Sequence, residues 1–390
     1  MKKDYGKSKI ILFITLFLVM VGFGIIIPII PFYVNSMGGG SAALGIFMSA
    51  YSVMQFFFAP FWGRLSDKIG RRPVLLIGLS GYGATFILFG LAKHLWILIL
   101  VRALSGMVSS ATLPTAMAYL ADITEGDERS KNMGMVGASM GLGMVFGPAI
   151  GGWLGHYSFS LPFFVSGILA FLIFPFAWKF LPETLKETNS HKKAEREKLS
   201  LNVIKNPLFI LFVFAFIMNF AMAIFESTFA LLVANKIGFG PQQMGTIFAL
   251  LGIVGVIVQG GLIGRLVKRF GDARLMKTGA WMCGIGFLMI ILSNNKLFMF
   301  LATSVFMAGN SLMGPTSNSL ATKNAAKGQG VSLGFMQSFG SLGRILGPIT
   351  GGVLYGFSMN LPYIVGASLL IIIVLIGSKK VTSYERIAVN

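Results

Sequence analysis

Three ionisable side chains lie deep inside long apolar stretches of this 390-residue sequence: Arg102, Glu226 and Arg344. A charge at the centre of a membrane costs about 2.5–3.5 kcal/mol, so such residues are kept for a partner, a cavity or a proton. Burial disfavours the ionised form of a carboxyl group, so a proton and a substrate cation can compete for Glu226. The alternative is a structural acid that a neighbouring arginine neutralises.

Glu226 shares one helical face with a polar, a flexible apolar and an aromatic side chain. These are Asn219, Met222 and Phe229, which lie seven, four and three residues away from it. A face of this mixture is typical of a cavity that binds an amphiphile. Buried amides elsewhere more often bind a neighbouring helix, and they are weaker candidates. The further candidates for the cavity are Tyr51, Gln55, Phe306, Asn310, Gln337 and Arg344.

The two arginines have two interpretations. If the helices begin and end as expected, Arg102 and Glu226 both lie on the order of 10–13 Å below the outer membrane surface, and they could pair across a cavity. The alternative for Arg102 and Arg344 is hydrogen bonding to backbone carbonyls at helix kinks. Two arginines against one glutamate argue against a simple cation site and leave zwitterionic and anionic amphiphiles open.

A charged motif follows the second apolar stretch, at residues 63–73. Its glycines permit a tight turn, its aspartate can accept from an arginine or a helix N-terminus, and its arginines can contact lipid headgroups or acids. Such a charge-paired loop can act as a conformational latch; the alternative is a positively charged anchor with a turn. The predicted latch residues are Gly63, Arg64, Asp67, Gly70, Arg71 and Asp122, with Arg72 beside them.

Long apolar stretches must position these residues. The chain is 55% hydrophobic and 12% charged, with a mean hydropathy of +0.78, which is typical of polytopic membrane proteins. A bilayer core of ~30 Å needs about 20 apolar residues per helix. Twelve stretches meet this length, at residues 10–34, 42–61, 74–92, 95–121, 132–154, 161–181, 207–234, 242–263, 275–293, 297–322, 331–357 and 361–378.

The net charge of +19 is a signal of topology rather than of nucleic-acid binding. With the N-terminus inside, the predicted cytoplasmic segments hold 27 Lys and Arg residues, while the outer loops hold only Lys93, Lys236 and Lys296. This distribution predicts a multi-pass protein of the cell membrane with both termini in the cytoplasm, facing anionic lipid. The lone Cys283 excludes an internal disulfide, and the three scattered histidines make a metal site unexpected.

An internal repeat gives the strongest evidence for the fold. Glycines four residues apart form a ridge on one helix face, and the Gly-Pro pair adds a kink. The pair at 147–148 recurs 200 residues later at 347–348. We therefore predict an all-α membrane protein of two six-helix bundles, at residues 1–181 and 207–390, with a cytoplasmic linker at 182–206. The ridge and its motif comprise Gly143, Gly147, Pro148, Gly151 and Gly152.

These motifs together resemble the major facilitator superfamily, and within it the twelve-helix drug:proton antiporters. The resemblance rests on GFGIIIPIIP at 22–31, the loop at 63–73, residues 98–106 and GPxxGG at 147–152. It implies that Arg102 takes part in proton coupling, that Glu226 carries protons and substrate, and that Asp67 belongs to the latch. It also implies that the glycine motif seals the cavity and shapes helix packing against the other half.

Three departures from the family pattern limit the resemblance. Asn310 stands where some relatives carry a second acid, which argues against a two-proton cycle. The first apolar stretch carries no acid, which disfavours the specificity of tetracycline–metal exporters. Lys268 stands in the second copy of the loop where Asp67 stands in the first, so the expected latch is asymmetric.

The sequence therefore predicts a secondary transporter that exports an amphiphilic small molecule in exchange for protons by alternating access. Its expected partners are that substrate, protons and membrane lipids but not nucleic acid; it is expected to be a monomer with no cofactor beyond the proton gradient. One rival is a proton-coupled exporter of sugars, metabolites or lipid-like anions. Another is a membrane sensor or enzyme, although the sequence has no nucleophile–base constellation, metal cluster or P-loop.

Overall fold

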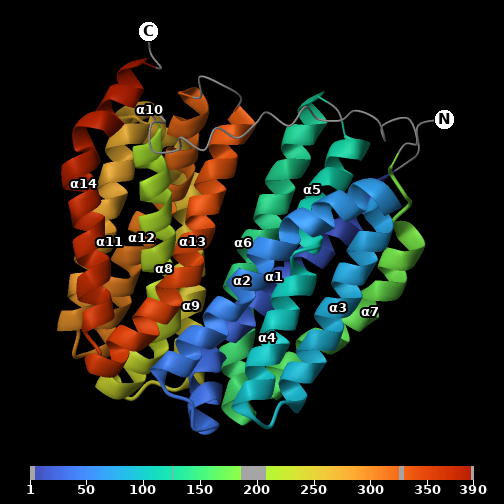
Figure 1. Ribbon diagram of the computed structural model, residues 1–390, viewed down its shortest axis with the longest axis horizontal. Coiled ribbons are helices and arrows are strands. Elements are labelled where there is room, and N and C mark those ends of the chain that lie inside the picture. Colours follow the sequence, from blue (N-terminus) through green and yellow to red (C-terminus); the bar gives the residue numbers. More distant parts are fainter. Residues whose placement is uncertain (1–4, 125, 186–207, 325–328, 388–390) are drawn as a thin grey trace. The chain divides into compact units, whose positions relative to one another are not determined.

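The computed structural model describes residues 5–124, 126–185, 208–324 and 329–387, and every regular element in these ranges is a helix (Figure 1). Eleven helices in this part of the chain are long and apolar enough to cross a membrane. Each of the twelve predicted stretches coincides with a helix or with consecutive helices, and the all-α membrane fold is confirmed. The eleventh stretch forms a helix that is not among the eleven candidate spans, and this helix carries Gln337 and Arg344.

The first half of the chain forms α1 (Gly6–Ser36), α2 (Ser41–Ile69), α3 (Arg71–Leu91), α4 (Leu95–Ser109), α5 (Thr112–Ile123), α6 (Gly126–Tyr157) and α7 (Leu161–Phe180). The second half forms α8 (Phe209–Ile237), α9 (Pro241–Val256), η3 (Ile257–Leu262), α10 (Ile263–Phe270), α11 (Asp272–Leu292), α12 (Lys296–Lys323), α13 (Gln329–Phe357) and α14 (Leu361–Ile387).

At three places the helices differ from the predicted stretches for a local reason. Helix α2 continues to Ile69 rather than ending near residue 61, because hydropathy marks the part inside the membrane and not the end of the helix. The stretch at 95–121 is interrupted between α4 and α5, where Pro114 lacks the N–H that would continue the helical hydrogen bonds. The stretch at 242–263 continues to Phe270 and passes through the π-helical segment η3, which contains two successive glycines.

The chain forms two compact units. The first comprises residues 1–38, 50–199 and 241–249, and the second comprises residues 39–49, 200–240 and 250–390. The beginning of α2 therefore belongs to the second unit, and the beginning of α9 belongs to the first. The boundaries predicted for two bundles and a linker stay a prediction, because most of the linker lies outside the described residues.

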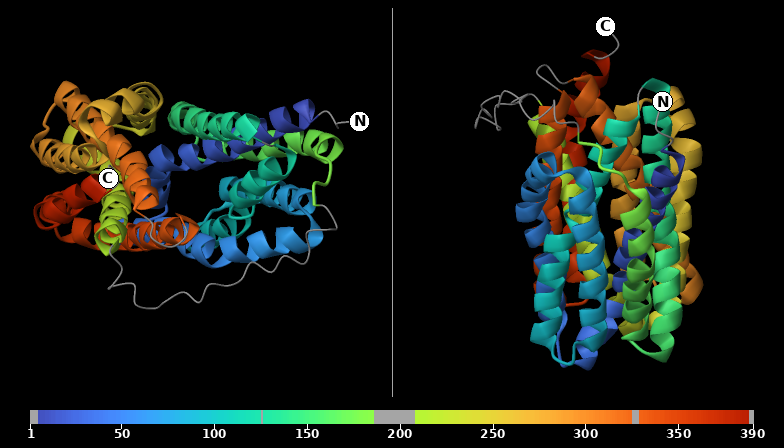
Figure 2. Two further views of the ribbon diagram at one scale, coloured as in Figure 1. Left: turned by 90° about the horizontal axis from the view of Figure 1, so that it is seen from above. Right: turned by 90° about the vertical axis from the view of Figure 1, so that its right-hand side faces the viewer.

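Each unit repeats the packing of the other. In the first unit α1 packs against α6 and α3 against α7, while in the second α8 packs against α13 and α11 against α14. Figure 2 shows the helices of each unit running alongside one another. Helices α3 and α11 begin 201 residues apart and also end 201 residues apart. The repeat in the sequence is thus a repeat in structure.

The glycine ridge of α6 allows α1 to approach closely, as the four-residue spacing predicted. A Cβ added at Gly147 would lie 2.5 Å from the Val21 carbonyl oxygen, and one added at Gly151 would lie 2.8 Å from that of Ile25. Real Cβ atoms do not come so near, so only glycine fits here without moving the backbone. The second copy repeats this contact, since a Cβ at Gly347 would lie 2.7 Å from the Phe220 carbonyl oxygen on α8.

A further glycine of the motif, Gly152, packs against the beginning of α9 within the first unit. A Cβ at Gly152 would lie 2.5 Å from the Pro241 carbonyl oxygen and 2.6 Å from the Cα of Gly245. The matching contact in the second unit brings Gly352 on α13 close to Ser41, at the beginning of α2. The glycine motif therefore serves two faces of its helix, one toward α1 and one toward α9.

Candidate functional site

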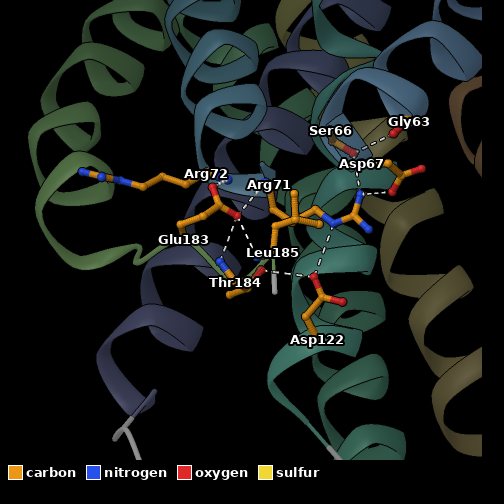
Figure 3. A network of polar contacts seen from close by, with 9 residues as sticks. All are labelled: Gly63, Ser66, Asp67, Arg71, Arg72, Asp122, Glu183, Thr184 and Leu185. Atoms are coloured by element: carbon orange, nitrogen blue, oxygen red, sulfur yellow. Dashed lines mark hydrogen bonds and ion pairs between the residues drawn. The ribbon is translucent and has the colours of Figure 1, made fainter. Parts of the chain in front are cut away.

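The charged motif at the turn between α2 and α3 is built around Arg71 (Figure 3). The guanidinium of Arg71 contacts Asp67 Oδ1 at 2.5 Å, Asp122 Oδ2 at 3.3 Å and Ser66 Oγ at 2.7 Å. These partners come from the end of α2 and the end of α5. The structure thus brings together Asp67, Arg71 and Asp122, three residues that sequence reasoning placed in one latch.

The turn itself depends on Gly70. Its φ of 107° lies where only glycine is comfortable. A Cβ at Gly70 would also lie 2.2 Å from Glu183 Oε2. Other predicted members of the latch lie apart from the Arg71 contacts: Arg64 donates to the Pro60 carbonyl of its own helix, and Gly63 contributes only a carbonyl that accepts from Ser66.

Sequence reasoning missed Glu183, which lies just after α7 and caps the N-terminus of α3. Its carboxylate accepts the backbone N–H groups of Arg71 at 2.9 Å and of Arg72 at 3.1 Å. It also accepts those of Thr184 and Leu185, each at 2.9 Å, while the Thr184 hydroxyl donates to Asp122 at 3.1 Å (Figure 3). A negative charge at the N-terminus of a helix interacts favourably with the helix dipole, so this carboxylate stabilises the beginning of α3. The signal available was a lone glutamate directly after an apolar stretch.

The second half carries the corresponding ion pair with the signs exchanged. Asp272 opens α11, is 3% exposed, and accepts from Lys323 at 2.7 Å and from Ser319 at 2.7 Å on α12. Asp272 and Lys323 follow Arg71 and Asp122 by 201 residues each. The comparison of Asp67 with Lys268 indicated asymmetry but overlooked this pair, in which the acid is buried.

Arg102 is almost wholly buried in the first unit, with 2% exposure on α4. Its guanidinium carbon lies 4.4 Å from the centre of the Tyr51 ring and 6.0 Å from that of Phe23. A desolvated cation over aromatic faces is held by the ring quadrupole. The neighbouring candidate Gln55 lies half-buried one turn along α2. Arg102 and Glu226 belong to different units, so their pairing stays a prediction.

Glu226 lies half-buried near the middle of α8, together with Asn219 and Met222, which are also half-buried. Asn219 accepts from Arg344 Nη1 at 2.7 Å and donates to the Ala215 carbonyl. Arg344 Nη2 also donates to Ser341 at 3.1 Å. One predicted face of α8 is thus joined to the predicted face of α13 by an amide–arginine contact.

Two aromatic candidates lie in the packed interior of the second unit. Phe229 is 0% exposed and stacks on Phe225 with ring centres 4.5 Å apart. Phe306 lies between Phe225 at 4.7 Å and Phe287 at 4.6 Å. These rings fill the helix interface, whereas Asn310 is half-buried and Gln337 is exposed. Helical spacing alone could not separate an interface-filling aromatic from a cavity-lining one.

In the described residues, no group of three or more His, Cys, Asp and Glu side chains could hold a metal ion. What the geometry offers is a few charges within apolar helices and an ion pair at a helix turn, which recurs with its signs exchanged in the second unit. These features define the class as a membrane transport protein built by duplication.

Comparison with known proteins identifies the family. The model of the Major Facilitator Superfamily matches residues 12–327 and again residues 260–383. The chain belongs to this superfamily.

Among curated proteins, it is 30% identical to multidrug resistance protein 2 of Bacillus subtilis over 386 residues, covering 95% of each chain. It is 26% identical to the quinolone resistance protein NorA of Staphylococcus aureus, covering 96% of this chain and 97% of that protein.

Solved structures share the fold at lower identity. The nucleoside transporter NupG matches with a TM-score of 0.78 at 14% identity, over 96% of this chain and 98% of the other. The human organic anion transporter MFSD10 matches with a TM-score of 0.69 at 22% identity, over 95% of this chain and 98% of the other. At these identities the likeness concerns the architecture alone.

Proposed function

We propose that this protein is a proton-coupled antiporter that exports amphiphilic drugs or related small molecules by alternating access. The observation that carries the proposal is the half-buried Glu226, the one acid in the apolar helix α8. It is supported by the similarity to proteins named for multidrug and quinolone resistance over nearly the whole chain. In this proposal the protein works as a monomer in the cell membrane, with both termini in the cytoplasm.

Glu226 alternates between a proton and the substrate. When the site faces the cytoplasm, a cationic or polar amphiphile displaces the proton from the carboxyl group. When the site faces outward, a proton displaces the substrate, because the charged carboxylate is costly in an apolar surrounding. Arg102 takes part by its positive charge, which favours the deprotonated state of an acid that approaches it.

The ion pairs of Arg71 act as the latch of this cycle. Arg71 contacts acids on two different helices, so a change in the angle between those helices must break at least one contact. An exposed ion pair is worth about 0–1 kcal/mol, which is small enough to break and re-form in every cycle.

The test is uphill efflux of ethidium from proteoliposomes driven by an imposed pH gradient. The wild-type protein is expected to pump, and Glu226→Gln is expected to lose pumping while still binding the dye. Glu128→Gln serves as a control because it also removes one carboxylate, that of the exposed pair with Lys9. Full pumping by Glu226→Gln contradicts the proposal. Transport of neutral or anionic solutes in place of ethidium would favour the exporter of sugars, metabolites or lipid-like anions.

A further inference from the structure

An apolar groove lies between α3 and α7 on the outside of the first unit, next to the charged turn. It encloses about 340 Å³ and is lined by Leu76, Ile77 and Phe174 along its length and by Arg72 and Trp178 at one end. Ile77 is 42% exposed and Trp178 is 57% exposed, so the groove opens to the surroundings of the protein. Its volume is within the range of sites that hold small amphiphilic ligands.

The polar end of the groove carries a positioned cation. Arg72 Nη2 donates to the Trp178 carbonyl at 2.5 Å, and the guanidinium carbon lies 5.6 Å from the centre of a Trp178 ring. Arg72 Nε is buried and makes no hydrogen bond to any described residue. Figure 3 shows the Arg72 side chain pointing away from the Arg71 network. A fixed guanidinium with a spare donor favours an anionic oxygen ligand.

The nearest acid is engaged with the backbone. Both carboxylate oxygens of Glu183 accept N–H groups, at Arg71 for one oxygen and at Arg72 for the other. The Glu183 carboxylate therefore caps the beginning of α3. The Arg72 side chain points toward α7, where it contacts Trp178. Two further cations, Lys7 and Lys179, lie 5.7 and 5.5 Å from the centre of the Phe180 ring at the end of α7.

A phospholipid fits this arrangement in both of its parts. Tryptophan and arginine at the end of a spanning helix are typical of the membrane interface, where the lipid phosphate lies. The apolar lining beyond them faces the region of the acyl chains. Basic pockets between helices at the cytoplasmic surface bind anionic headgroups. We propose that this groove is a binding site for an anionic phospholipid, with its phosphate on Arg72 and one acyl chain along Ile77 and Phe174.

The second half of the chain does not repeat the cation, since Ala273 occupies the position 201 residues after Arg72. The site thus belongs to the first unit, and the second repeat has no equivalent arginine at this position. The site is also independent of Glu226, so its test does not depend on the transport mechanism.

The experiment measures lipid binding to the purified full-length protein by native mass spectrometry, with phosphatidylglycerol titrated against phosphatidylcholine. The wild type is expected to retain one phosphatidylglycerol more tightly than phosphatidylcholine. Arg72→Gln is expected to weaken phosphatidylglycerol by about five- to tenfold, because one charge-assisted contact is lost. Ile77→Trp fills the groove and is expected to weaken it as well, whereas Arg72→Lys keeps part of the affinity.

The matched control is Arg269→Gln, which removes an arginine that also lies near an aromatic ring, 5.3 Å from the centre of that of Phe270. It is expected to leave the tight phosphatidylglycerol in place. Equal losses in Arg72→Gln and Arg269→Gln would overturn the proposal, because a general effect of surface charge would explain both. Displacement of the lipid by inorganic phosphate alone, or by ethidium, would also overturn it, because the groove would then hold a free anion or a transport substrate.

Discussion

The two ion pairs at the ends of α5 and α12 differ in sign for a reason that individual residues explain. The helix dipole makes a positive charge at the beginning of a helix destabilising and a negative charge there stabilising. Arg71 opens α3 with the unfavourable sign, and Glu183 supplies the negative charge from outside the helix. Asp272 opens α11 with the favourable sign itself. Ser383 and Tyr384 occupy the positions 200 and 201 residues after Glu183, and neither is an acid.

Removing the cap of α3 should therefore destabilise the first unit. Glu183→Ala leaves two backbone N–H groups at the beginning of α3 without their acceptor, and loss of such a cap costs about 0.5–2 kcal/mol. Glu183→Gln keeps an acceptor oxygen and should cost less. Thermal unfolding of the purified protein, followed by tryptophan fluorescence, measures both. Glu128→Ala, at an exposed pair with Lys9, is the control and should change stability by under about 0.5 kcal/mol.

A double-mutant cycle can measure the coupling between Asp272 and Lys323, the ion pair of the second half. Asp272→Asn and Lys323→Gln each remove one charge of a contact whose acid is buried, and each should lower the unfolding temperature. Because the two residues share one contact, the double variant should be less destabilised than the sum of the singles, by about 1 kcal/mol. Simple additivity of the two effects would mean that the pair contributes no coupling.

At the scale of elements, close backbone approach decides which helices pack together. Helix α6 meets α1 through Gly143, Gly147 and Gly151, and α13 meets α8 through Gly343 and Gly347. In lipid there is no hydrophobic drive between helices, so packing of this kind provides much of the association. The same helices also carry glycines, such as Gly137 and Gly334, at which an added Cβ would meet no atom of another helix within 4 Å. These positions serve as controls for the ridges.

Gly147→Ala should destabilise the protein and reduce transport, because the added methyl group would lie 2.5 Å from the Val21 carbonyl oxygen. Overpacking of this kind typically costs about 1–3 kcal/mol. Gly137→Ala on the same helix has no atom within 4 Å of the new Cβ and should be tolerated or slightly stabilising. Unfolding temperature and ethidium efflux, measured on both variants, test the difference. Equal behaviour of the two would argue against a packing role for the ridge.

For the whole molecule, the scaffold is duplicated and the ionisable residues of the spans are not. Ile26, Ala302 and Met144 occupy the positions 200 residues away from Glu226, Arg102 and Arg344. In the proposed cycle the two similar units move, and the unrepeated charges supply the coupling. A single titrating acid favours the exchange of one proton for one substrate.

For a monovalent cation such an exchange moves no net charge, so the membrane potential should have no effect, although each transferred charge would otherwise count for about 2.3 kcal/mol per 100 mV. Efflux of ethidium should therefore stop when nigericin collapses the pH gradient and continue when valinomycin collapses the potential alone. Efflux that follows the potential would require a different number of protons per cycle.

The sequence by itself determined the class of fold, the repeat and the position of the charges. The length of an apolar stretch and the spacing of its glycines are local properties of the sequence. They can be recognised around Gly147 or Glu226 without knowing which residues these segments contact. The tertiary structure alone decided which partners these residues meet. Glu183 reaches α3 across more than 100 residues of chain, Asp272 pairs with a lysine from α12, and Phe306 stacks on Phe287. These contacts depend on which helix faces pack together, and the sequence of one helix does not specify which other helix packs against it.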